Sequence, residues 1–87
     1  MEWKLFADLA EVAEARTVSV EVQTNATVGE ALDALFQAHP ALESRVIADD
    51  GGLHDHINVL RNGEPAELGM PAETGDELAL FPPVSGG

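Results

Sequence analysis

The two residues best suited to chemistry in this 87-residue chain are Gly86 and Gly87, which close the sequence with a free carboxylate. Glycine has no side chain, so both positions could enter a narrow channel and let their backbone approach another protein closely. A carboxylate at such an end can serve as an acyl group that is passed to an acceptor. We therefore expect Gly87 to be the reacting residue and the rest of the chain to act as its handle.

The four residues before the two glycines are Pro82, Pro83, Val84 and Ser85. The prolines end any strand that precedes them, and such segments extend by about 3.1 Å per residue. Residues 82–87 would then reach on the order of 19 Å, far enough to enter a partner protein. The sequence thus predicts a folded domain over residues 1–81 and an extended tail over residues 82–87. We expect a partner to recognise the tail from Pro82 to Gly86.

A second candidate for chemistry is the run His54-Asp55-His56. In an extended segment His54 and His56 would share one face, with Asp55 on the other. Two imidazoles without a third converging ligand make a weak zinc site, so we expect a solvated loop, no bound metal and no cofactor. No pair of nucleophile and base and no phosphate-binding loop is evident in the sequence. The chain is therefore not expected to be an enzyme.

Lys4 is the only lysine of the chain. If copies of the chain were joined to one another through a side-chain amine, only Lys4 or the N-terminus could accept the new bond. Because Lys4 lies within a predicted strand, we expect such linked chains to be rare or absent.

The charge of the chain is strongly unbalanced, with sixteen acidic residues against four basic ones and a net charge of −12. Direct binding to nucleic acid is disfavoured, because the phosphates would be repelled. The repulsion within the chain destabilises a compact state at low salt and is screened in molar salt, where the Debye length is about 3 Å. The scattered acidic residues suggest a surface adapted to a salt-rich cytoplasm; the alternative is an ordinary acidic domain.

Composition also limits where and how the chain is expected to work. There is no cysteine, which excludes disulfides, thiolate metal sites and cysteine nucleophiles. No run approaches the ~20 apolar residues of a membrane span, and the start does not resemble a signal peptide. A cytoplasmic location without membrane contact is the expectation that follows.

Two strands and a short helix are predicted at the start of the chain. Residues 2–6 alternate apolar and polar side chains until Phe6 breaks the pattern, and residues 17–22 alternate valines with polar residues. Residues 7–15 between them carry apolar side chains at helical spacing. Because the two strands are close in sequence, an antiparallel pair is expected.

The clearest helix signal is a capping box formed by Thr27 and Glu30, in which each side chain accepts a hydrogen bond from the other residue's N–H. Apolar residues then follow on one helical face: Val28, Ala31, Leu32, Leu35 and Phe36. Pro40 ends the helix, because the residue before a proline avoids the α conformation.

Three further segments are predicted before the last strand. Residues 41–47 are expected to form one more helical turn and a short strand, and residues 57–61 a longer strand. The dipeptide Asn62-Gly63 that follows is a strong signal for a type I′ hairpin turn. Pro65 then restricts the next segment to an edge of the sheet or a loop.

The last strand, residues 78–81, is apolar throughout, which suits a central position covered by its neighbours. The order of elements predicts an α+β fold of the β-grasp type. In that fold a mixed sheet of about five strands wraps around one main helix, with the first and last strands central and parallel.

The end of the chain closely resembles the C-terminus of the molybdopterin-synthase small subunit, which runs Gly-Asp-Glu, an apolar strand, Pro-Pro-Val, a small residue and Gly-Gly. The matching stretch here is Gly75-Asp76-Glu77-Leu78-Ala79-Leu80-Phe81-Pro82-Pro83-Val84-Ser85-Gly86-Gly87. Leu5-Phe6-Ala7, Thr27-Val28 and Asn62-Gly63 are also similar, so the resemblance covers nearly the whole chain. With its acidic bias, the chain resembles the haloarchaeal small archaeal modifiers, ubiquitin-like members of the MoaD/ThiS-like sulfur-carrier family.

The resemblance implies that an E1-like activating enzyme uses ATP to join the Gly87 carboxylate to AMP. The adenylate could then modify lysines of target proteins, with a metalloprotease reversing the bond, or become a thiocarboxylate that delivers sulfur through the molybdopterin-synthase large subunit. The alternatives are a dedicated molybdopterin-synthase small subunit and a non-covalent interaction module with an inert tail.

The resemblance also implies that Phe81 docks on such partners, and Leu60 on the neighbouring strand could join it in an apolar patch. The alternative is that both residues belong to the core. The sequence departs from the family at Ala10, where many sulfur carriers have arginine, and at Glu14-Ala15, where a glycine often ends the first helix. A salt bridge to a partner at Ala10 is therefore in doubt.

Overall fold

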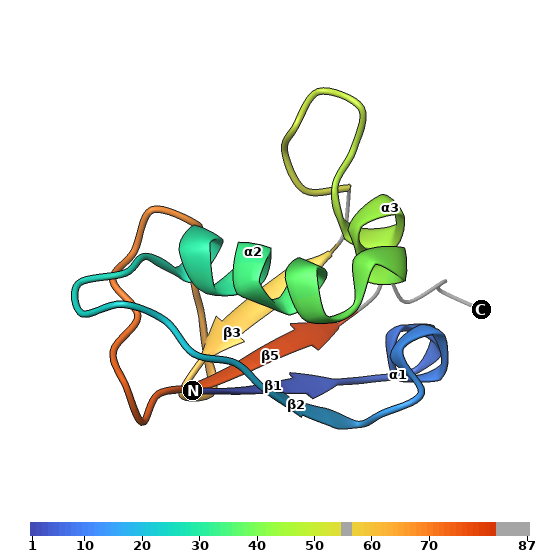
Figure 1. Cartoon of the computed structure of the whole chain (residues 1–87). Coiled ribbons are helices and arrows are strands. Elements are labelled where there is room, and N and C mark those ends of the chain that lie inside the picture. The colour runs from blue at the N-terminus through green and yellow to red at the C-terminus, as the bar shows by residue number, and fades with distance from the viewer. Residues whose placement is uncertain (55–56, 82–87) are drawn as a thin grey trace.

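The fold is a mixed sheet with one long helix across one of its faces (Figure 1). The computed structural model describes residues 1–54 and 57–81. Within these ranges the strands are β1 (Glu2–Leu5), β2 (Thr17–Ser19), β3 (Asn58–Arg61), β4 (Glu64–Pro65) and β5 (Glu77–Phe81). The helices are α1 (Asp8–Ala13), α2 (Val28–Ala38), the short 3₁₀ helix η1 (Pro40–Leu42) and α3 (Glu43–Val46).

The first and last strands lie side by side at the centre of the sheet, whose order is β2-β1-β5-β3-β4. β1 and β5 run parallel, with Trp3 opposite Leu78 and Leu5 opposite Leu80. β2 pairs antiparallel with β1, and β3 pairs antiparallel with β5. The predicted β-grasp fold, its central parallel pair and the antiparallel pair at the start of the chain are all confirmed.

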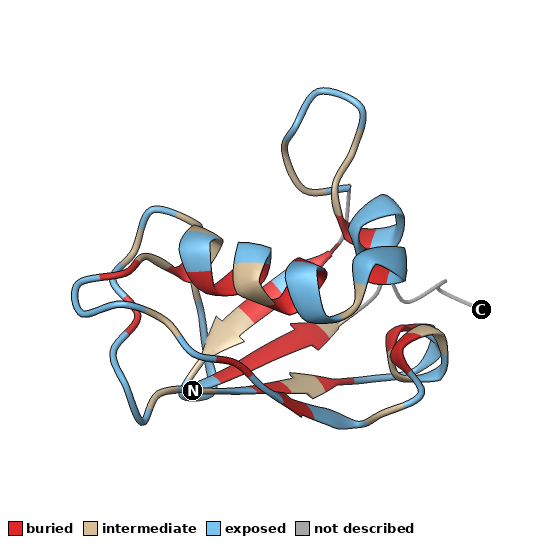
Figure 2. Ribbon diagram, in the orientation of Figure 1, coloured by how far each residue is buried: buried red, intermediate tan, exposed pale blue. Residues whose placement is uncertain are grey.

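Helix α2 begins at the predicted capping box. The Thr27 hydroxyl accepts a hydrogen bond from the Glu30 N–H at 3.1 Å, and the Glu30 carboxylate accepts one from the Thr27 N–H at 3.1 Å. The predicted apolar face of the helix is buried against the sheet (Figure 2). Periodicity and capping, which are local signals, were therefore sufficient to place this helix.

Trp3 ties the central strand β1 to α2. Its side chain is fully buried, and its indole Nε1–H donates to the carbonyl oxygen of Ala31 on α2 at 3.0 Å. A buried indole must satisfy its single donor, and here the helix backbone provides the acceptor. The bond fixes the position of the helix along the sheet.

The hairpin between β3 and β4 has the predicted turn. Asn62 and Gly63 both have positive φ, at 52° and 84°, as a type I′ turn requires. Arg61 and Glu64 face each other across the turn. β4 forms one edge of the sheet, which agrees with the restriction expected from Pro65.

Two details of the predicted elements were wrong. β2 ends at Ser19 and not at residue 22, because Ser19 already pairs with Glu2 at the start of β1; beyond it, Val20 exchanges hydrogen bonds with Met1, the residue before β1. The short strand expected within residues 41–47 is absent, since η1 and α3 occupy most of that stretch. Leu42 and Val46, both fully buried, are four residues apart, which is helical spacing.

Helix α1 ends at Glu14, a residue with left-handed backbone geometry (φ 56°, ψ 32°). The Ala15 N–H donates to the Ala10 carbonyl at 3.1 Å, and the Glu14 N–H to that of Glu11 at 3.2 Å. This is the type of helix end at which glycine is preferred, because a β-carbon strains the left-handed conformation. At this departure from the family pattern the chain therefore leaves α1 in the conformation that a glycine usually provides, but with a glutamate.

Replacing Glu14 with glycine is expected to raise the free energy of unfolding by about 1 kcal/mol, because the left-handed strain is relieved. Glu14→Gln is the matched control, since it removes the charge and keeps the β-carbon. Chemical denaturation of the three proteins measures the difference. Equal stabilities for the glycine and glutamine variants would contradict the strain argument.

Candidate functional site

The candidate site lies at the end of the sheet from which the tail departs. Because β1 and β5 are parallel, both end at the same edge, where α1 also lies (Figure 1). Phe81 is the last residue of β5 and the last described residue before the tail. The predicted reacting residue, Gly87, and the predicted recognition residues Pro82, Pro83, Val84, Ser85 and Gly86 lie outside the described residues.

Phe6 and Phe81 stack on each other at the root of the tail. Their ring centroids are 4.1 Å apart, and the rings are nearly parallel, at 13°. Phe6 is 39% exposed, and no other large hydrophobic side chain in the described ranges is classed as exposed. The sequence reasoning did not assign Phe6 a role, although the break that it makes in the alternation of the first strand was a usable signal.

Phe81 and Leu60 lie on the sheet face that α2 leaves uncovered. Leu78 and Leu80 of β5 belong to the core, so the residues that alternate with them face the other way. Leu60 pairs with Ala79 and therefore shares its face with Phe81 two residues further along. Both Leu60 and Phe81 are half-buried and lie outside the core cluster. The alternative that they are core residues is wrong, whereas docking through them stays a prediction.

Phe6, Leu60, Ala79 and Phe81 are called the tail-root patch below. Phe6 is exposed, Leu60 and Phe81 are half-buried, and Ala79 is buried. Accessible apolar side chains that gather at one place on a small domain are typical of an interaction surface. The patch is modest, and its interest lies in its position where the tail begins.

Lys4 also lies on the uncovered face of the sheet, opposite Ala79. Its Nζ is 3.2 Å from a carboxylate oxygen of Glu77, and its side chain is 42% exposed. A surface ion pair of this kind contributes little to stability, but it holds the amine close to the sheet. The expectation that Lys4 rarely accepts another chain remains a prediction.

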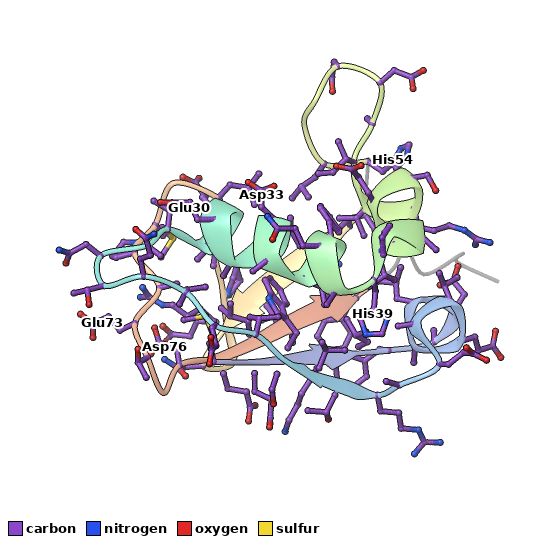
Figure 3. All side chains as sticks on the ribbon, in the orientation of Figure 1. Glu30, Asp33, His39, His54, Glu73 and Asp76 are labelled. Carbon is purple, nitrogen blue, oxygen red and sulfur yellow. The ribbon has the colours of Figure 1, made fainter. Side chains whose placement is uncertain are left out.

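The turn before β5 is held by a side-chain network around Asp76. One carboxylate oxygen accepts from the Asn62 side-chain amide at 3.0 Å, and the other from the Glu73 N–H at 2.9 Å. The Asn62 side-chain oxygen in turn accepts from the Glu77 N–H at 3.0 Å. Gly75, with φ 97°, makes the turn possible. Figure 3 shows Glu73 and Asp76 at this turn, so the network fixes where β5, and hence the tail, begins.

The hydrogen bond from the Glu73 N–H, followed by that from Asn62, holds the pKa of Asp76 below its usual value. A group whose pKa is lower in the folded state stabilises the fold above its unfolded pKa, and this stabilisation disappears as the pH falls through the folded pKa. Its contribution is thus present at neutral pH and is lost in acid, below about pH 4.

We expect Asp76→Asn to lower the melting temperature by a few degrees at pH 7, with the difference from the wild type shrinking as the pH falls from about 4 toward 2. The melting temperatures of the wild type and of Asp76→Asn are measured at each pH. The effects of the other carboxylates on stability are common to both proteins and cancel in the difference. A deficit that stays constant down to the lowest pH would show that the charge of Asp76 does not matter.

The histidine pair is only half described. The ring nitrogen Nε2 of His54 is 3.2 Å from the carbonyl oxygen of Ser44, beside α3 (Figure 3). His56 lies outside the described residues. In the ranges 1–54 and 57–81, no group of three histidine, aspartate or glutamate side chains is arranged to hold a metal ion. The same ranges contain no helix that is long and apolar enough to cross a membrane.

Comparison with known proteins gives one consistent result. Residues 3–87 match the model of the ThiS family. The chain is 76% identical over 87 residues, the full length of both chains, to Small archaeal modifier protein 1 of Haloferax volcanii. The crystal structure of that protein, SAMP1, superposes with a TM-score of 0.96, at 76% identity, over 100% of this chain and 98% of the other.

A more distant likeness is to a chain in the crystal structure of the BexX/CysO complex of Amycolatopsis orientalis. Here the identity is 26%, the TM-score is 0.83, and the match covers 99% of this chain and 98% of the other. These relatives share the β-grasp fold described above, and their family consists of small modifiers and sulfur carriers and not of catalytic enzymes. The chain therefore belongs to the ThiS family and, within it, to the small archaeal modifier proteins.

Proposed function

We propose that this protein is activated at the Gly87 carboxylate and then transferred to lysines of target proteins, and that it also carries sulfur as a thiocarboxylate. One observation carries the proposal: the sequence places Pro-Pro-Val-Ser-Gly-Gly immediately after β5, a central strand that ends beside an exposed apolar patch. The fold acts as the handle and the tail as the reactive arm. The 76% identity to a small archaeal modifier supports this assignment.

Activation is needed because a carboxylate resists nucleophiles. In the proposed first step a carboxylate oxygen of Gly87 attacks the α-phosphorus of ATP in an E1-like enzyme, and pyrophosphate leaves. The product is an acyl-adenylate, in which AMP is a good leaving group. This chain supplies the acyl group and its reach, while the enzyme supplies ATP and the catalytic groups, so the chain itself needs no cofactor.

Two acceptors can then displace AMP. Attack by a lysine amine forms an isopeptide bond and releases AMP and a proton, which modifies the target protein; a metalloprotease would hydrolyse this bond. Transfer of sulfide from a donor forms a thiocarboxylate, which can pass its sulfur to a pterin precursor bound to the molybdopterin-synthase large subunit. A chain in the BexX/CysO complex has the same fold, which supports the idea that such carriers work by docking on another protein.

Mass spectrometry of the protein and of its conjugates from native cells tests the proposal. A gain of ~16 Da on the free chain, from one oxygen replaced by sulfur, indicates the thiocarboxylate. Because Arg61 is the last basic residue, trypsin would leave the whole of residues 62–87 on a target lysine. A protease that cuts after acidic residues leaves only residues 78–87, because Glu77 is the last of these.

Both signatures together support the double role. The thiocarboxylate without conjugates would reduce the function to that of a dedicated molybdopterin-synthase small subunit. If neither signature is found and the tail is unmodified under all growth conditions, the protein would be a non-covalent interaction module.

We also propose that the acidic surface is adapted to high salt. In the described ranges the structure gives only two ion pairs, Lys4–Glu77 and Arg45–Asp8, so most of the sixteen acidic residues lack a cationic partner there. Screening of their repulsion should stabilise the fold. We expect the melting temperature to rise by ten degrees or more, a rough figure, between dilute buffer and molar KCl. A melting temperature that does not change with salt would refute the adaptation.

A further inference from the structure

The turn between β3 and β4 carries a dipeptide that can react with itself. In Asn62-Gly63 the backbone nitrogen of the glycine can close a five-membered ring with the side-chain amide carbon of the asparagine. Gly63 has no side chain to hinder this approach, and no described atom beyond its chain neighbours lies within 4 Å of the place where its β-carbon would stand. Both residues are exposed, so water and small bases can reach them. The dipeptide therefore has the composition and the access that spontaneous loss of the amide requires.

The other two asparagines of the chain are less suited to this reaction. Asn25 precedes Ala26 and Asn58 precedes Val59, so in both cases a β-carbon stands beside the attacking nitrogen, and the valine is branched there. Asn58 also lies within strand β3, whose backbone is held in the sheet by pairing with β5. Asn62 is thus the position at which the sequence favours the reaction.

The fold restrains the Asn62 side chain by hydrogen bonds to the start of β5. Its amide nitrogen donates to the Asp76 carboxylate at 3.0 Å, and its amide oxygen accepts from the Glu77 N–H at 3.0 Å. The Asn62 backbone N–H also donates to the Glu77 carbonyl, at 2.7 Å. For Gly63 to attack, the amide carbon has to reach a near-attack geometry and its nitrogen has to leave. Both hydrogen bonds of the side-chain amide must then be released.

Asp76, which holds the leaving nitrogen, is itself fixed. Its second carboxylate oxygen accepts from the Glu73 N–H at 2.9 Å, within the turn that precedes β5. The amide of Asn62 is therefore freed when this local contact opens, and such openings cost less than unfolding of the whole domain. The rate of reaction at Asn62 reports the fraction of molecules in which the turn before β5 is open.

We propose that Asn62 is a site of spontaneous deamidation that Asp76 protects, so that opening of the turn before β5 leaves a permanent covalent mark. Hydroxide or another base in the solvent takes the proton of the Gly63 nitrogen, which forms a bond to the amide carbon of Asn62. The bond from that carbon to the side-chain nitrogen breaks, and the nitrogen takes up a proton and leaves as ammonia. Water then opens the ring at either carbonyl, which gives aspartate or isoaspartate. The net change is one amide and one water converted to one carboxylic acid and ammonia.

The product is expected to weaken the attachment of β5. An aspartate at position 62 has no donor for the Asp76 carboxylate, so two negatively charged oxygens face each other where a hydrogen bond of 3.0 Å stood. Isoaspartate, in addition, lengthens the backbone of a two-residue turn in which both φ angles are positive. Asn62→Asp reproduces the first product, and we expect it to melt a few degrees below the wild type at pH 7.

The test follows two tryptic peptides during incubation of the full-length protein in molar KCl at mildly alkaline pH. The peptide of residues 62–87 contains Asn62 and no other asparagine or glutamine, so a gain of ~1 Da in it is unambiguous. The peptide of residues 46–61 contains Asn58 and likewise no other amide side chain, and it serves as the control within the same molecule.

Three variants separate protection by Asp76 from other effects. Asp76→Ala removes the acceptor that holds the Asn62 amide. Asp33→Ala makes the same change of charge on the exposed face of α2, far along the chain from the turn (Figure 3). Trp3→Phe weakens the fold elsewhere, by removing the hydrogen bond from the indole to the helix. Melting curves in the incubation buffer confirm that all the proteins are folded.

In the wild type, we expect the mass gain to be faster in the 62–87 peptide than in the 46–61 peptide. In Asp76→Ala the gain at Asn62 should be about tenfold faster, as the loss of one hydrogen bond to a charged group predicts. Asp33→Ala and Trp3→Phe should match the wild type, and the wild type unfolded in urea should react fastest of all.

Equal rates for Asp76→Ala and Asp33→Ala would overturn the protection by Asp76. A rate for Trp3→Phe as high as that for Asp76→Ala would also overturn it, because unfolding of the whole domain and not opening of the turn would then control the reaction. No mass gain in the chain unfolded in urea would show that Asn62 is not a deamidation site. Asn62→Asp with the melting temperature of the wild type would refute the expected weakening of β5.

Discussion

Deletion of Gly87 is expected to abolish adenylation while leaving the melting temperature unchanged. Removal of one residue withdraws the carboxylate by about 3 Å along an extended tail. A misplacement of 1 Å in an enzyme site can cost a factor of about 100 in rate, so the loss here should exceed that and reach the background of the assay. The core cluster of the described residues spans positions 3–80, and we expect it to fold without the last residue, so stability should not change.

Extension of the chain by one residue beyond Gly87 is the complementary experiment, because it moves the carboxylate too far and adds bulk. ATP–pyrophosphate exchange and thermal melting are measured on both variants and the wild type. The carrier hypothesis fails if exchange survives both changes. A fall in melting temperature would instead indicate that the tail packs against the fold.

Trp3→Ala is expected to cost about 3–5 kcal/mol of unfolding free energy, which is a large share of the stability of a domain of this size. The substitution leaves a cavity between the central strand β1 and α2, and it removes the hydrogen bond from the indole to Ala31. With a net charge of −12 working against compactness, the variant should be largely unfolded in dilute buffer and should recover in molar KCl. Circular dichroism in both buffers measures this.

Trp3→Phe serves as its control, since it keeps most of the apolar volume and removes only the N–H donor. We expect it to be less destabilised than Trp3→Ala. If both variants were as stable as the wild type, Trp3 would not join the sheet to the helix as described.

The elements that were predicted well are those whose sequence signals are local, or for which two independent signals agree. The capping box at Thr27 and the Asn62-Gly63 turn each specify a backbone geometry within four residues, and the structure has both. The central position of β5 followed from the apolar character of residues 78–81, because at the edge of the sheet some of these apolar side chains would be exposed to water. Order and direction of the strands then followed from the rules of connection.

The features that were missed depend on contacts between distant segments. The stacking of Phe6 on Phe81 joins residues 75 positions apart, and no local pattern reports it. The hydrogen bond from the Trp3 indole to the Ala31 carbonyl is likewise a tertiary contact that no local pattern predicts. The segment 41–47 was misjudged in part because it is short, and a helix and a strand both explain a few buried positions. The tail chemistry rests on residue type and resemblance alone.

The parallel pairing of β1 with β5 also determines when the protein can fold during its synthesis. The middle of the sheet can form only after Leu78 has been synthesised, because Leu78 pairs with Trp3. This pairing closes a loop of almost the whole chain, which costs conformational entropy. Folding is therefore expected to be slow for a domain this small. Ribosomes deliver the last strand and the tail together. A chain that terminates before β5 therefore lacks a central strand of the sheet, and it is left as unfolded material for proteases. The architecture thus couples a stable fold to a complete central strand, so that folded molecules are those whose synthesis has passed β5.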